Sequence, residues 1–541
     1  MIGLGHLRMY ARFALGLRGF LAEPTTIEVA RSLLAARLAN RDESFLKVAE
    51  RGIYGHAGSP YLPLLRRAGC ELGDLQRMVR ADGLEPTLAT LRCSGVYFSF
   101  EEWKGRRPVV RGDLELGVDA HSFDNPHLSK VYEGSTGGST GVGTRLALDL
   151  DDIAARAPIT LLAQKAQGVL DLPRATVFGR LPDPTAINSI LGMARSGRRI
   201  DRWFCPVIDG VRPTPIQYRV THHYVVRVGR WLGVAVPDPE PLPLNETVRV
   251  ARWAAQACRE HGGAAISSSA SMAVRIATAA READIDLTGV VMMSGGEPLT
   301  QAKAEAIAAS GARAIPSYHM SEVGAIGRGC PRATDPNDQH FQSDHLALIQ
   351  APRSVGSFEV QAFLLTTLLP TAKRILLNVE IDDYGTVEPS SCGCPLETYG
   401  FDRVLRHIRS FSKLTAEGVT LVGSEMEHIL ESVLPARFGG TPLDYQLMEE
   451  EDSAGLTRVV LIIAPRVGFV DEGAVIEAVL TALRGASLGT AVGGGLLSAA
   501  GSLRVRRAEP IVTARGKLLP LHLGQRTPQA LSRVEGEVRA S

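Results

Sequence analysis

Apolar positions follow two different periods along this chain, and the two periods predict different elements. Over the first hundred residues the apolar side chains recur at helical spacing, as in PTTIEVARSLLAARLANRDESFLKVAERG. From about Val109 to Asp402, β-branched runs such as GVVMMSGG, ARAIPSYH, HLALIQAP and RILLNVEI alternate with alanine-rich helical runs such as SASMAVRIATAAREADI and TQAKAEAIAASG. This alternation predicts layers of helices on a sheet, an α/β fold.

The pattern changes after Arg409, where a smaller unit begins. A helix (SEMEHILESVL), a strand (TRVVLIIAP), a second helix (EGAVIEAVLTALRGA) and a second strand (SLRVRRA) follow one another there. We therefore predict a large N-terminal α/β domain over residues 1–408, with a mainly helical start over 1–108. A hinge joins it to a small, mobile α+β domain over 409–541.

One loop interrupts these patterns with glycine and hydroxyl side chains. Residues 134–141 read GSTGGSTG, between the predicted strand LSKVYE and the predicted helix DLDDIAARAPITLLAQKA. Ordering glycine costs about 0.5–1 kcal/mol per residue, so such a run is either a flexible connector or a loop that needs unusual dihedrals. A loop of the second kind points its N–H groups into one concavity, which suits phosphate oxygens. It is neither a Walker loop, since GSTGGSTGVGTR lacks lysine, nor a dinucleotide fingerprint.

Composition and charge exclude several classes of function. The 541 residues are 45% hydrophobic, and 59 basic against 58 acidic residues leave a net charge of +1, so no global field attracts nucleic acid. Arg8, Arg12 and Arg18 interrupt the apolar N-terminus, and no run approaches the ~20 apolar residues of a membrane span. An amphipathic surface helix stays an alternative there. The odd number of cysteines, seven, favours a reducing compartment, and we expect a cytoplasmic protein.

Three further stretches, together with the glycine loop, resemble the adenylate-forming superfamily of acyl-CoA synthetases and adenylation domains. The closest branch is similar to phenylacetate-CoA ligase. The loop resembles the family's S-S-G-T-T-G-x-P-T, MMSGGEPLT resembles the segment that holds adenine, and YHMSEVG resembles Y-G-x-T-E. Order and spacing agree across more than 180 residues. The resemblance implies ATP and Mg²⁺ as cofactors.

The resemblance also assigns roles to individual residues. Tyr318 would stack on adenine, Ser321 would reach the α-phosphate, and Glu322 would hold Mg²⁺. In isolation Tyr318 also reads as a core aromatic and Glu322 as a helix-start carboxylate. The implied nucleotide-binding set is Thr136, Gly137, Gly138, Ser139, Thr140, Gly141, Gly295, Gly296, Glu297, Pro298, Tyr318, Asp383 and Arg409.

Three of the implied residues lie in or near the small domain. Asp383, in EIDDYG, and Arg409 stand where the family contacts the ribose, and Lys517, in TARGKLLP, stands where the family has a lysine that enters the site during adenylation. Carboxylate activation needs donors around the phosphates, a divalent ion and a cation near the attacking oxygen. The loop, Glu322 and Lys517 would supply these three, although Lys517 alone also reads as a surface lysine.

These features predict an enzyme that converts a carboxylic acid, of the aryl class in the branch it resembles, to an acyl adenylate with release of pyrophosphate. Transfer to coenzyme A would follow. Two departures keep alternatives open: the loop has Val142 and Gly143 in place of the usual lysine and proline, and the hinge segment RSFSK has Phe411 and Ser412 where the family is acidic. The alternatives are transfer to a carrier protein or an amine, activation of another oxyanion, or a non-catalytic nucleotide-binding protein.

A metal site is predicted beside the nucleotide motifs. Cys392 and Cys394 form a C-x-C pair, and GCPRATDPNDQHF adds Cys330 and His340. Three thiols and one imidazole suit a structural zinc ion. At this point His345 or Asp344 could replace His340. The remaining cysteines are expected to be core residues.

The acyl pocket is predicted only by analogy with the fold. It would lie between the segments DRWFCPVIDG and AISSSASMAVRIA. His222 and His223, in VTHHYVV, are interpreted as strand residues of which only one faces the pocket. The predicted lining residues are Trp203, Phe204, Ser267 and Ser268.

Overall fold

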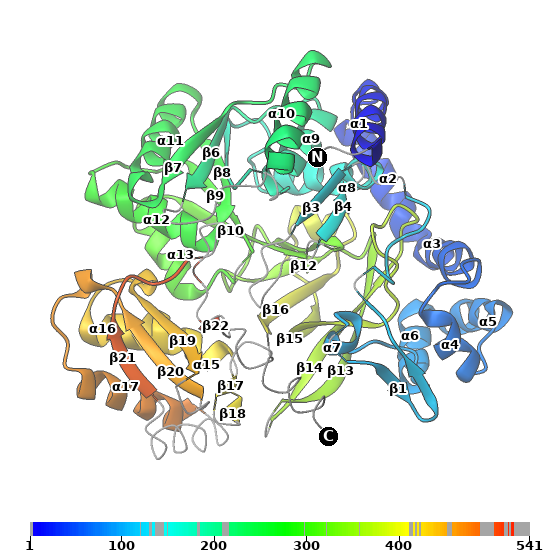
Figure 1. Ribbon diagram of the computed structural model, residues 1–541. Helices are drawn as coiled ribbons and strands as arrows, with labels where there is room; N and C mark the ends of the chain where they lie inside the picture. Colours follow the sequence, from blue (N-terminus) through cyan, green and yellow to red (C-terminus); the bar gives the residue numbers. More distant parts are fainter. Residues whose placement is uncertain are drawn as a thin grey trace.

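The computed structural model has a large α/β body and a smaller α+β unit beside it (Figure 1). The predicted fold class is thereby confirmed. The structure describes residues 4–105, 107–119, 121–128, 132–135, 145–148, 150–180, 184–207, 216–296, 298–320, 322–355, 358–410, 415–416, 419–420, 423–451, 457–486, 503–512, 518 and 521–523.

A twelve-stranded sheet organises the large body, in the order β13-β14-β15-β16-β12-β11-β10-β9-β8-β5-β6-β7. The half from β10 to β7 is parallel, and the half from β10 through β11 to β13 is antiparallel. Strand β10 is therefore the junction of the two halves, because it pairs parallel with β9 and antiparallel with β11. The strands are β5 Arg174–Val177, β6 Arg202–Val207, β7 Pro239–Pro243, β8 Ala264–Ser269, β9 Val290–Gly295, β10 Arg313–Met320, β11 Gly324–Gly329, β12 Gln339–Phe341, β13 Leu346–Val355, β14 Phe358–Thr367, β15 Val379–Pro389 and β16 Arg403–Ser410.

The helices beside the parallel half are rich in alanine, and this composition lets them lie close to the strands. Ala251, Ala254 and Ala273 are fully buried in one core with Ile266 and Met292 of the sheet. These elements are α8 Leu150–Ala166, α9 Thr185–Arg195, α10 Ile216–Trp231, η2 Leu244–Glu246, α11 Val248–His261, α12 Ala270–Glu282 and α13 Gln301–Ala308, with α14 Pro395–Thr398 further along the chain.

The N-terminal helices after residue 40 pack against the antiparallel half and share its core, whereas the first two helices pack on α8. Tyr61, Phe98 and Phe123 meet edge to face there, with ring centroids of Tyr61 and Phe98 5.2 Å apart. The elements are α1 Leu4–Ala22, α2 Ile27–Ala39, α3 Arg41–Val48, the π-helical η1 Ala49–Tyr54, α4 Tyr61–Arg67, α5 Leu72–Asp82, α6 Leu84–Cys93 and α7 Phe100–Trp103, followed by the hairpins β1 Val109–Arg111 with β2 Leu114–Leu116 and β3 Tyr132–Ser135 with β4 Arg145–Leu148.

The smaller unit has its own sheet, in the order β21-β20-β19-β22, and its own core around Leu447, Leu461 and Val475. It contacts the large body at α13 (Figure 1). Its elements are β17 Thr415–Ala416, β18 Val419–Thr420, α15 Gly423–His428, η3 Ile429–Val433, α16 Leu434–Phe438, η4 Pro442–Asp444, β19 Tyr445–Glu451, β20 Thr457–Ile463, η5 Pro465–Val467, α17 Glu472–Ala486, β21 Leu503–Arg507 and β22 Leu521–Leu523.

Two sequence predictions of strands are wrong. RILLNVEI forms a strand only from Val379, because Asn378 takes a left-handed conformation (φ 53°) and its side-chain amide donates to the carbonyl of Leu88 at 2.7 Å. VTHHYVV lies in helix α10, where His222 is buried and His223 is exposed. Apolar residues at short spacing fit either element, and the contacts of the folded chain select the helix.

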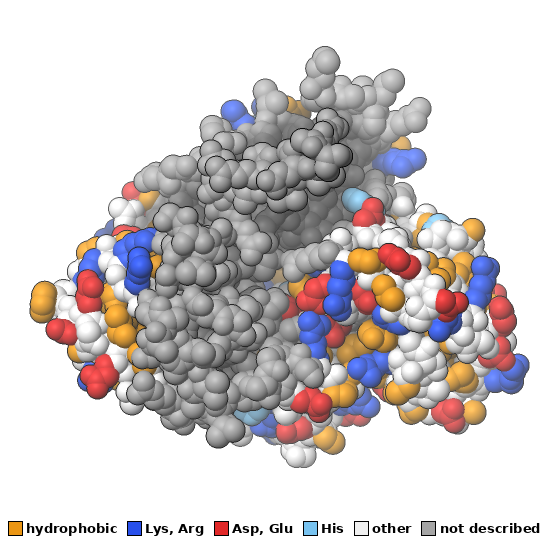
Figure 2. Space-filling model, turned by 60° about the horizontal axis from the view of Figure 1, so that its bottom comes forward, with side chains coloured by type: hydrophobic (Ala, Val, Ile, Leu, Met, Phe, Trp, Pro, Cys, Tyr) orange, Lys and Arg blue, Asp and Glu red, His pale blue; other side chains and the backbone are white. Residues whose placement is uncertain are grey.

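The described surface carries mixed charge. Figure 2 shows Lys and Arg interspersed with Asp and Glu on the described parts of this face, in line with the net charge of +1. Among the described helices, none combines the length and the apolar character needed to cross a membrane.

Candidate active site

Residues predicted to bind nucleotide meet where the parallel and antiparallel halves of the sheet join. Gly295, the last residue of β9, pairs with Ser317 of β10, and Ser317 also pairs with Arg328 of β11. Gly296 follows with φ 76°, a conformation that favours glycine. Ligands of open α/β sheets bind outside the carboxyl ends of parallel strands, and these residues lie at such ends.

Tyr318 and Asp383 come together although they are 65 positions apart in the sequence. The Tyr318 hydroxyl donates to the Asp383 carboxylate, and its backbone N–H donates to Gln339 Oε1 at 2.6 Å. Burial, and then the Asp383 charge, raise the pKa of Tyr318 well above its usual value, so the phenol stays a donor. The backbone of Arg409 is nearby, because Tyr384 pairs with Arg409 in the register of β15 and β16.

Glu322 is buried two residues after β10 and forms an ion pair with Lys104. Lys104 Nζ lies 2.8 Å from Glu322 Oε1 and 3.9 Å from the centroid of the Trp103 ring. Burial raises the pKa of Glu322, but the Lys104 charge and hydrogen bond outweigh it, and the net pKa is lowered. Glu322 is therefore ionised at neutral pH. The sequence interpretation missed Lys104, because only the fold brings the end of α7 to Glu322.

A second charged cluster lies beside Glu322. Arg156 of α8 pairs with Asp152 one helical turn away, and Lys373 Nζ lies 3.4 Å from the same carboxylate. Burial, and then the Arg156 charge, lower the pKa of Lys373 to about 8. His319 has an exposed side chain that lines the cavity near these cations, and desolvation followed by the charge of Arg328 lowers its pKa. The i, i+4 spacing of Asp152 and Arg156 was a usable signal in the sequence.

A cavity of about 350 Å³ opens between α8, α9 and the ends of the strands. Ser267 and Ser268 line it, as do Gly295 and Gly296. Trp203 and Phe204, predicted with the serines, lie elsewhere: both are buried in hydrophobic cores and neither belongs to the cavity wall. The Trp203 indole donates to the carbonyl of Phe178 at 2.9 Å, and Phe178 takes its place in the wall. A broad hollow of about 1010 Å³ elsewhere brings no predicted site residues together.

The four predicted zinc ligands form one cluster. Their ligand atoms lie within 4.8 Å of one another, and His340 Nε2 is 3.1 Å from Cys394 Sγ and 3.5 Å from Cys392 Sγ. His340 Nδ1 bonds to the carbonyl of Phe401 at 2.8 Å, which turns Nε2 toward the thiols. Three thiols and one oriented imidazole fit tetrahedral zinc.

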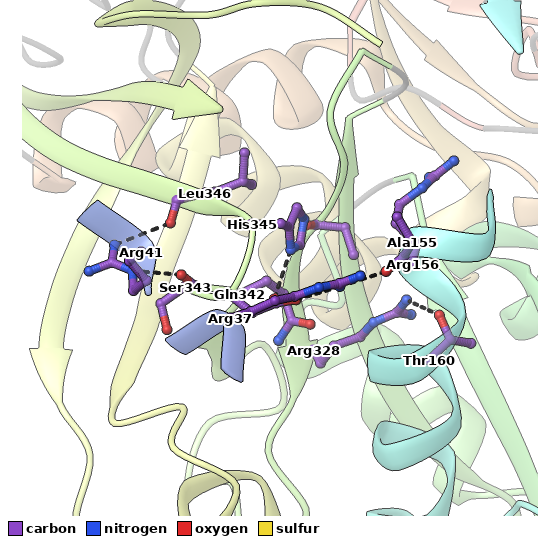
Figure 3. Close-up of polar contacts among 12 residues, drawn as sticks. Arg37, Arg41, Ala155, Arg156, Thr160, Arg328, Gln342, Ser343, His345 and Leu346 are labelled. Carbon is purple, nitrogen blue, oxygen red and sulfur yellow. Dashed lines mark hydrogen bonds and ion pairs between the residues drawn. The ribbon is translucent and has the colours of Figure 1, made fainter. Parts of the chain in front are cut away.

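The alternative metal ligands are engaged in another network. His345 bonds to Asp344 and to the carbonyl of Ala325, each at 2.8 Å. Arg37, which lies near His345 in Figure 3, pairs with Asp344 at 3.3 Å. His340 is therefore the histidine of the metal cluster.

Several predicted site residues lie outside the described residues. They are Thr136, Gly137, Gly138, Ser139, Thr140, Gly141, Glu297, Ser321 and Lys517, together with Phe411 and Ser412 of the hinge segment. Pro298 is described, and its carbonyl lies 3.5 Å from Lys303 Nζ.

This chain is similar to a solved structure. No family model and no curated protein matches the sequence. The structure of 2-hydroxyisobutyryl-CoA ligase in the postadenylation state, in complex with R3-HIB-AMP, matches with a TM-score of 0.53 at 15% identity, over 96% of this chain and 93% of that chain. This chain has the adenylate-forming enzyme fold. Two matches to structures with that fold have lower scores: the same ligase in the thioesterification state (TM-score 0.45, 15% identity, 94% and 93% coverage) and the anthranilate CoA ligase AuaEII (0.43, 12%, 84% and 76%).

Proposed function

We propose that this protein activates a carboxylic acid with ATP. A carboxylate oxygen attacks the α-phosphorus of ATP, the bond to the β-phosphate oxygen breaks, and an acyl adenylate and pyrophosphate form. The observation that carries the proposal is the junction at β10. Gly295 and Gly296 line a cavity there that is large enough for a compact acid, and β10 with the turn after it also carries Tyr318, paired with Asp383, and Glu322. The similar ligase supports it, since that enzyme was solved in complex with R3-HIB-AMP.

Each residue has a chemical task in this proposal. Tyr318 would lie against adenine, while Asp383 accepts from the ribose hydroxyls. Glu322 is the candidate ligand of Mg²⁺, which when bound would offset phosphate charge. Ser321, Lys517 and residues 136–141 complete the proposed site. Leu518 is buried in the same core as Leu299 and Met292 of the large body.

In a second step we propose that coenzyme A takes the acyl group. Its thiolate would attack the acyl carbonyl, and the carbon–oxygen bond to AMP would break. The similar ligase supports this step, since that enzyme is a CoA ligase and was solved in the postadenylation state. The domain boundary between residues 408 and 409, a structural zinc ion, membership of the phenylacetate-CoA ligase-like branch and a cytoplasmic location remain parts of the proposal.

A carrier protein or an amine is the alternative acceptor. One feature of the sequence favours this alternative acceptor. The hinge segment has Phe411 and Ser412 in place of acidic residues, and we propose that the second step depends on rotation about that hinge. Acceptor choice is measured by adding coenzyme A, a pantetheinylated carrier protein or hydroxylamine after adenylate formation.

Acid-dependent release of pyrophosphate tests the proposed function. With ATP, Mg²⁺ and a panel of aryl and aliphatic acids, we expect at least one acid to support it. Lys517→Ala should lower the rate at least ~10²-fold, the usual scale for losing one preorganised charge contact. Lys47→Ala, on the exposed face of α3, is the matched control. A normal rate in Lys517→Ala would remove the lysine from the mechanism, and no turnover with any acid would overturn the function.

A further inference from the structure

The cavity wall carries cations and no carboxylate. Arg156, Arg174, Arg328 and Lys373 line it, and no Asp or Glu belongs to the wall as far as the described residues extend. Asp152, just outside the wall, is shared between Arg156 and Lys373. Positive charge therefore exceeds negative charge here. Burying a charge without a partner costs several kcal/mol per ion, so a bound anion would stabilise this wall.

Arg174 and Arg328 form no ion pair with any described residue. Arg174 is buried and donates to the carbonyl of Val169, whereas Arg328 is partly exposed. The Arg328 guanidinium donates to Thr160 Oγ1 at 3.2 Å (Figure 3) and to Ser317 Oγ at 3.1 Å, both neutral hydroxyls. Its Nε has no hydrogen-bond partner, and Arg328 forms no ion pair with any described residue. The neighbouring Arg37 differs, because it pairs with Asp344 at 3.3 Å. Two hydroxyls fix the plane of the Arg328 fork without neutralising its charge.

Arg328 is two strands away from Gly295, which lies at the end of the cavity where we propose that the nucleotide binds. Gly295, Ser317 and Arg328 form a row across β9, β10 and β11. Neighbouring strands are about 4.8 Å apart, so the Cα atoms of Gly295 and Arg328 are separated by roughly 10 Å. An acid that reacts near Gly296 can therefore extend its far end toward the guanidinium.

We propose that the acid this protein activates carries a second anionic group, and that Arg328, held by Ser317 and Thr160, binds that group. The inference rests on the proposed function and narrows its substrate to compact dicarboxylic acids. A guanidinium fork matches a carboxylate with two parallel hydrogen bonds. The wall between the two ends is largely apolar, with Ile153, Phe178 and Ile315, and it suits the hydrocarbon part of such an acid.

The first test uses the unmodified protein and matched pairs of acids. Glutarate is compared with its monomethyl ester, and isophthalate with its monomethyl ester, because each ester keeps the shape and loses one charge. In ATP–pyrophosphate exchange we expect kcat/KM for a diacid to exceed that of its ester at least about 10-fold, since hydrogen bonds to charged groups are worth roughly 1.5–3 kcal/mol. Equal values for acid and ester would overturn the inference. Exchange with none of a broad panel of acids would instead overturn the proposed function.

The second test changes Arg328. Arg328→Gln should lower kcat/KM for the diacid about 10- to 100-fold, mainly through KM, and bring the diacid-to-ester ratio close to one. Arg328→Lys should retain part of the ratio. Arg313→Gln is the control, since Arg313 lies on β10 and donates to Gln167 without lining the cavity.

A purely structural role for Arg328 predicts a different result. Both acids would then lose kcat/KM in parallel, and the ratio would stay as in the unmodified protein, which contradicts the inference. Should Arg328→Gln fail to fold, Thr160→Val removes one of the two hydroxyls that hold the fork. It should lower the diacid-to-ester ratio in the same direction.

Discussion

At the scale of single residues, the Lys104–Glu322 pair is the most consequential contact near the candidate site. The Lys104 side chain is 18% exposed and that of Glu322 is 6% exposed, so the pair is largely withdrawn from water. Removing one partner of a buried pair leaves the other charge uncompensated. Lys104 therefore stabilises the ionised form of the carboxylate that we propose as a Mg²⁺ ligand.

Lys104→Met should destabilise the fold by about 3–5 kcal/mol at pH 7, the usual cost of leaving a buried charge unpaired. Because the folded pKa of Glu322 is lowered, its stabilising contribution is present above the unfolded pKa of ~4.3 and is lost as the pH falls through the folded pKa. The deficit should therefore shrink toward pH 4. Urea unfolding at both pH values measures it, with Lys165→Met on the exposed side of α8 as control. A deficit that does not change with pH contradicts this account.

At the scale of elements, α13 and η3 form the polar contact between the large body and the small unit. Lys303 Nζ lies 3.1 Å from Glu431 Oε1, with side chains only 5% and 6% exposed. The Thr300 hydroxyl, at the N-cap of α13, also donates to Glu431. Rotation of the small unit would have to break these contacts, so they favour the orientation seen in Figure 1.

Lys303→Met should loosen the small unit, because Glu431 then lacks its ammonium partner. We expect faster limited proteolysis between residues 408 and 423 and a loss of stability of about 3–5 kcal/mol. The double variant Lys303→Met/Glu431→Met should recover most of the stability, since an apolar pair can replace a buried ion pair at little cost. If the double variant is as labile as the single one, the ion pair is not what holds the two units together.

At the scale of the whole molecule, the Cys/His cluster connects distant segments. Cys330 follows β11, His340 lies on β12, and Cys392 and Cys394 follow β15. Cys330 and Cys394 also belong to the core that holds residues of α2 and α8. A metal ion there would tie the antiparallel half of the sheet to the helices that line the cavity.

We expect the purified protein to hold about one zinc ion per chain, measured by elemental analysis. Because a structural zinc site contributes folding free energy, chelation should lower Tm by several degrees, and added zinc should restore it. Cys394→Ser should abolish both the zinc and the chelator effect. Cys93→Ser should change neither, because Cys93 is exposed and not in the core as the sequence predicted. A metal-free protein with an unchanged Tm in chelator would disprove the site.

Local pattern predicted most of the elements correctly. The helical spacing of EGAVIEAVLTALRGA matches α17, and the β-branched run GVVMMSGG contains β9. The prediction failed where tertiary contacts override local preference, at Asn378, whose left-handed backbone is held by contacts to the α6 region, and at His222 in α10.

The sequence by itself determined the fold class, the order of the motifs that resemble nucleotide-binding segments and the thiols of the Cys/His cluster, because periodicity and spacing are properties of the linear chain. Only the tertiary structure selected His340 over His345 and decided which charges meet. Lys104 reaches Glu322 across 218 residues, Thr160 reaches Arg328 across 168, and Phe178 lines the cavity in place of Trp203 and Phe204. Burial and pairing of charge depend on distances between segments that are remote in sequence, and folding alone sets those distances.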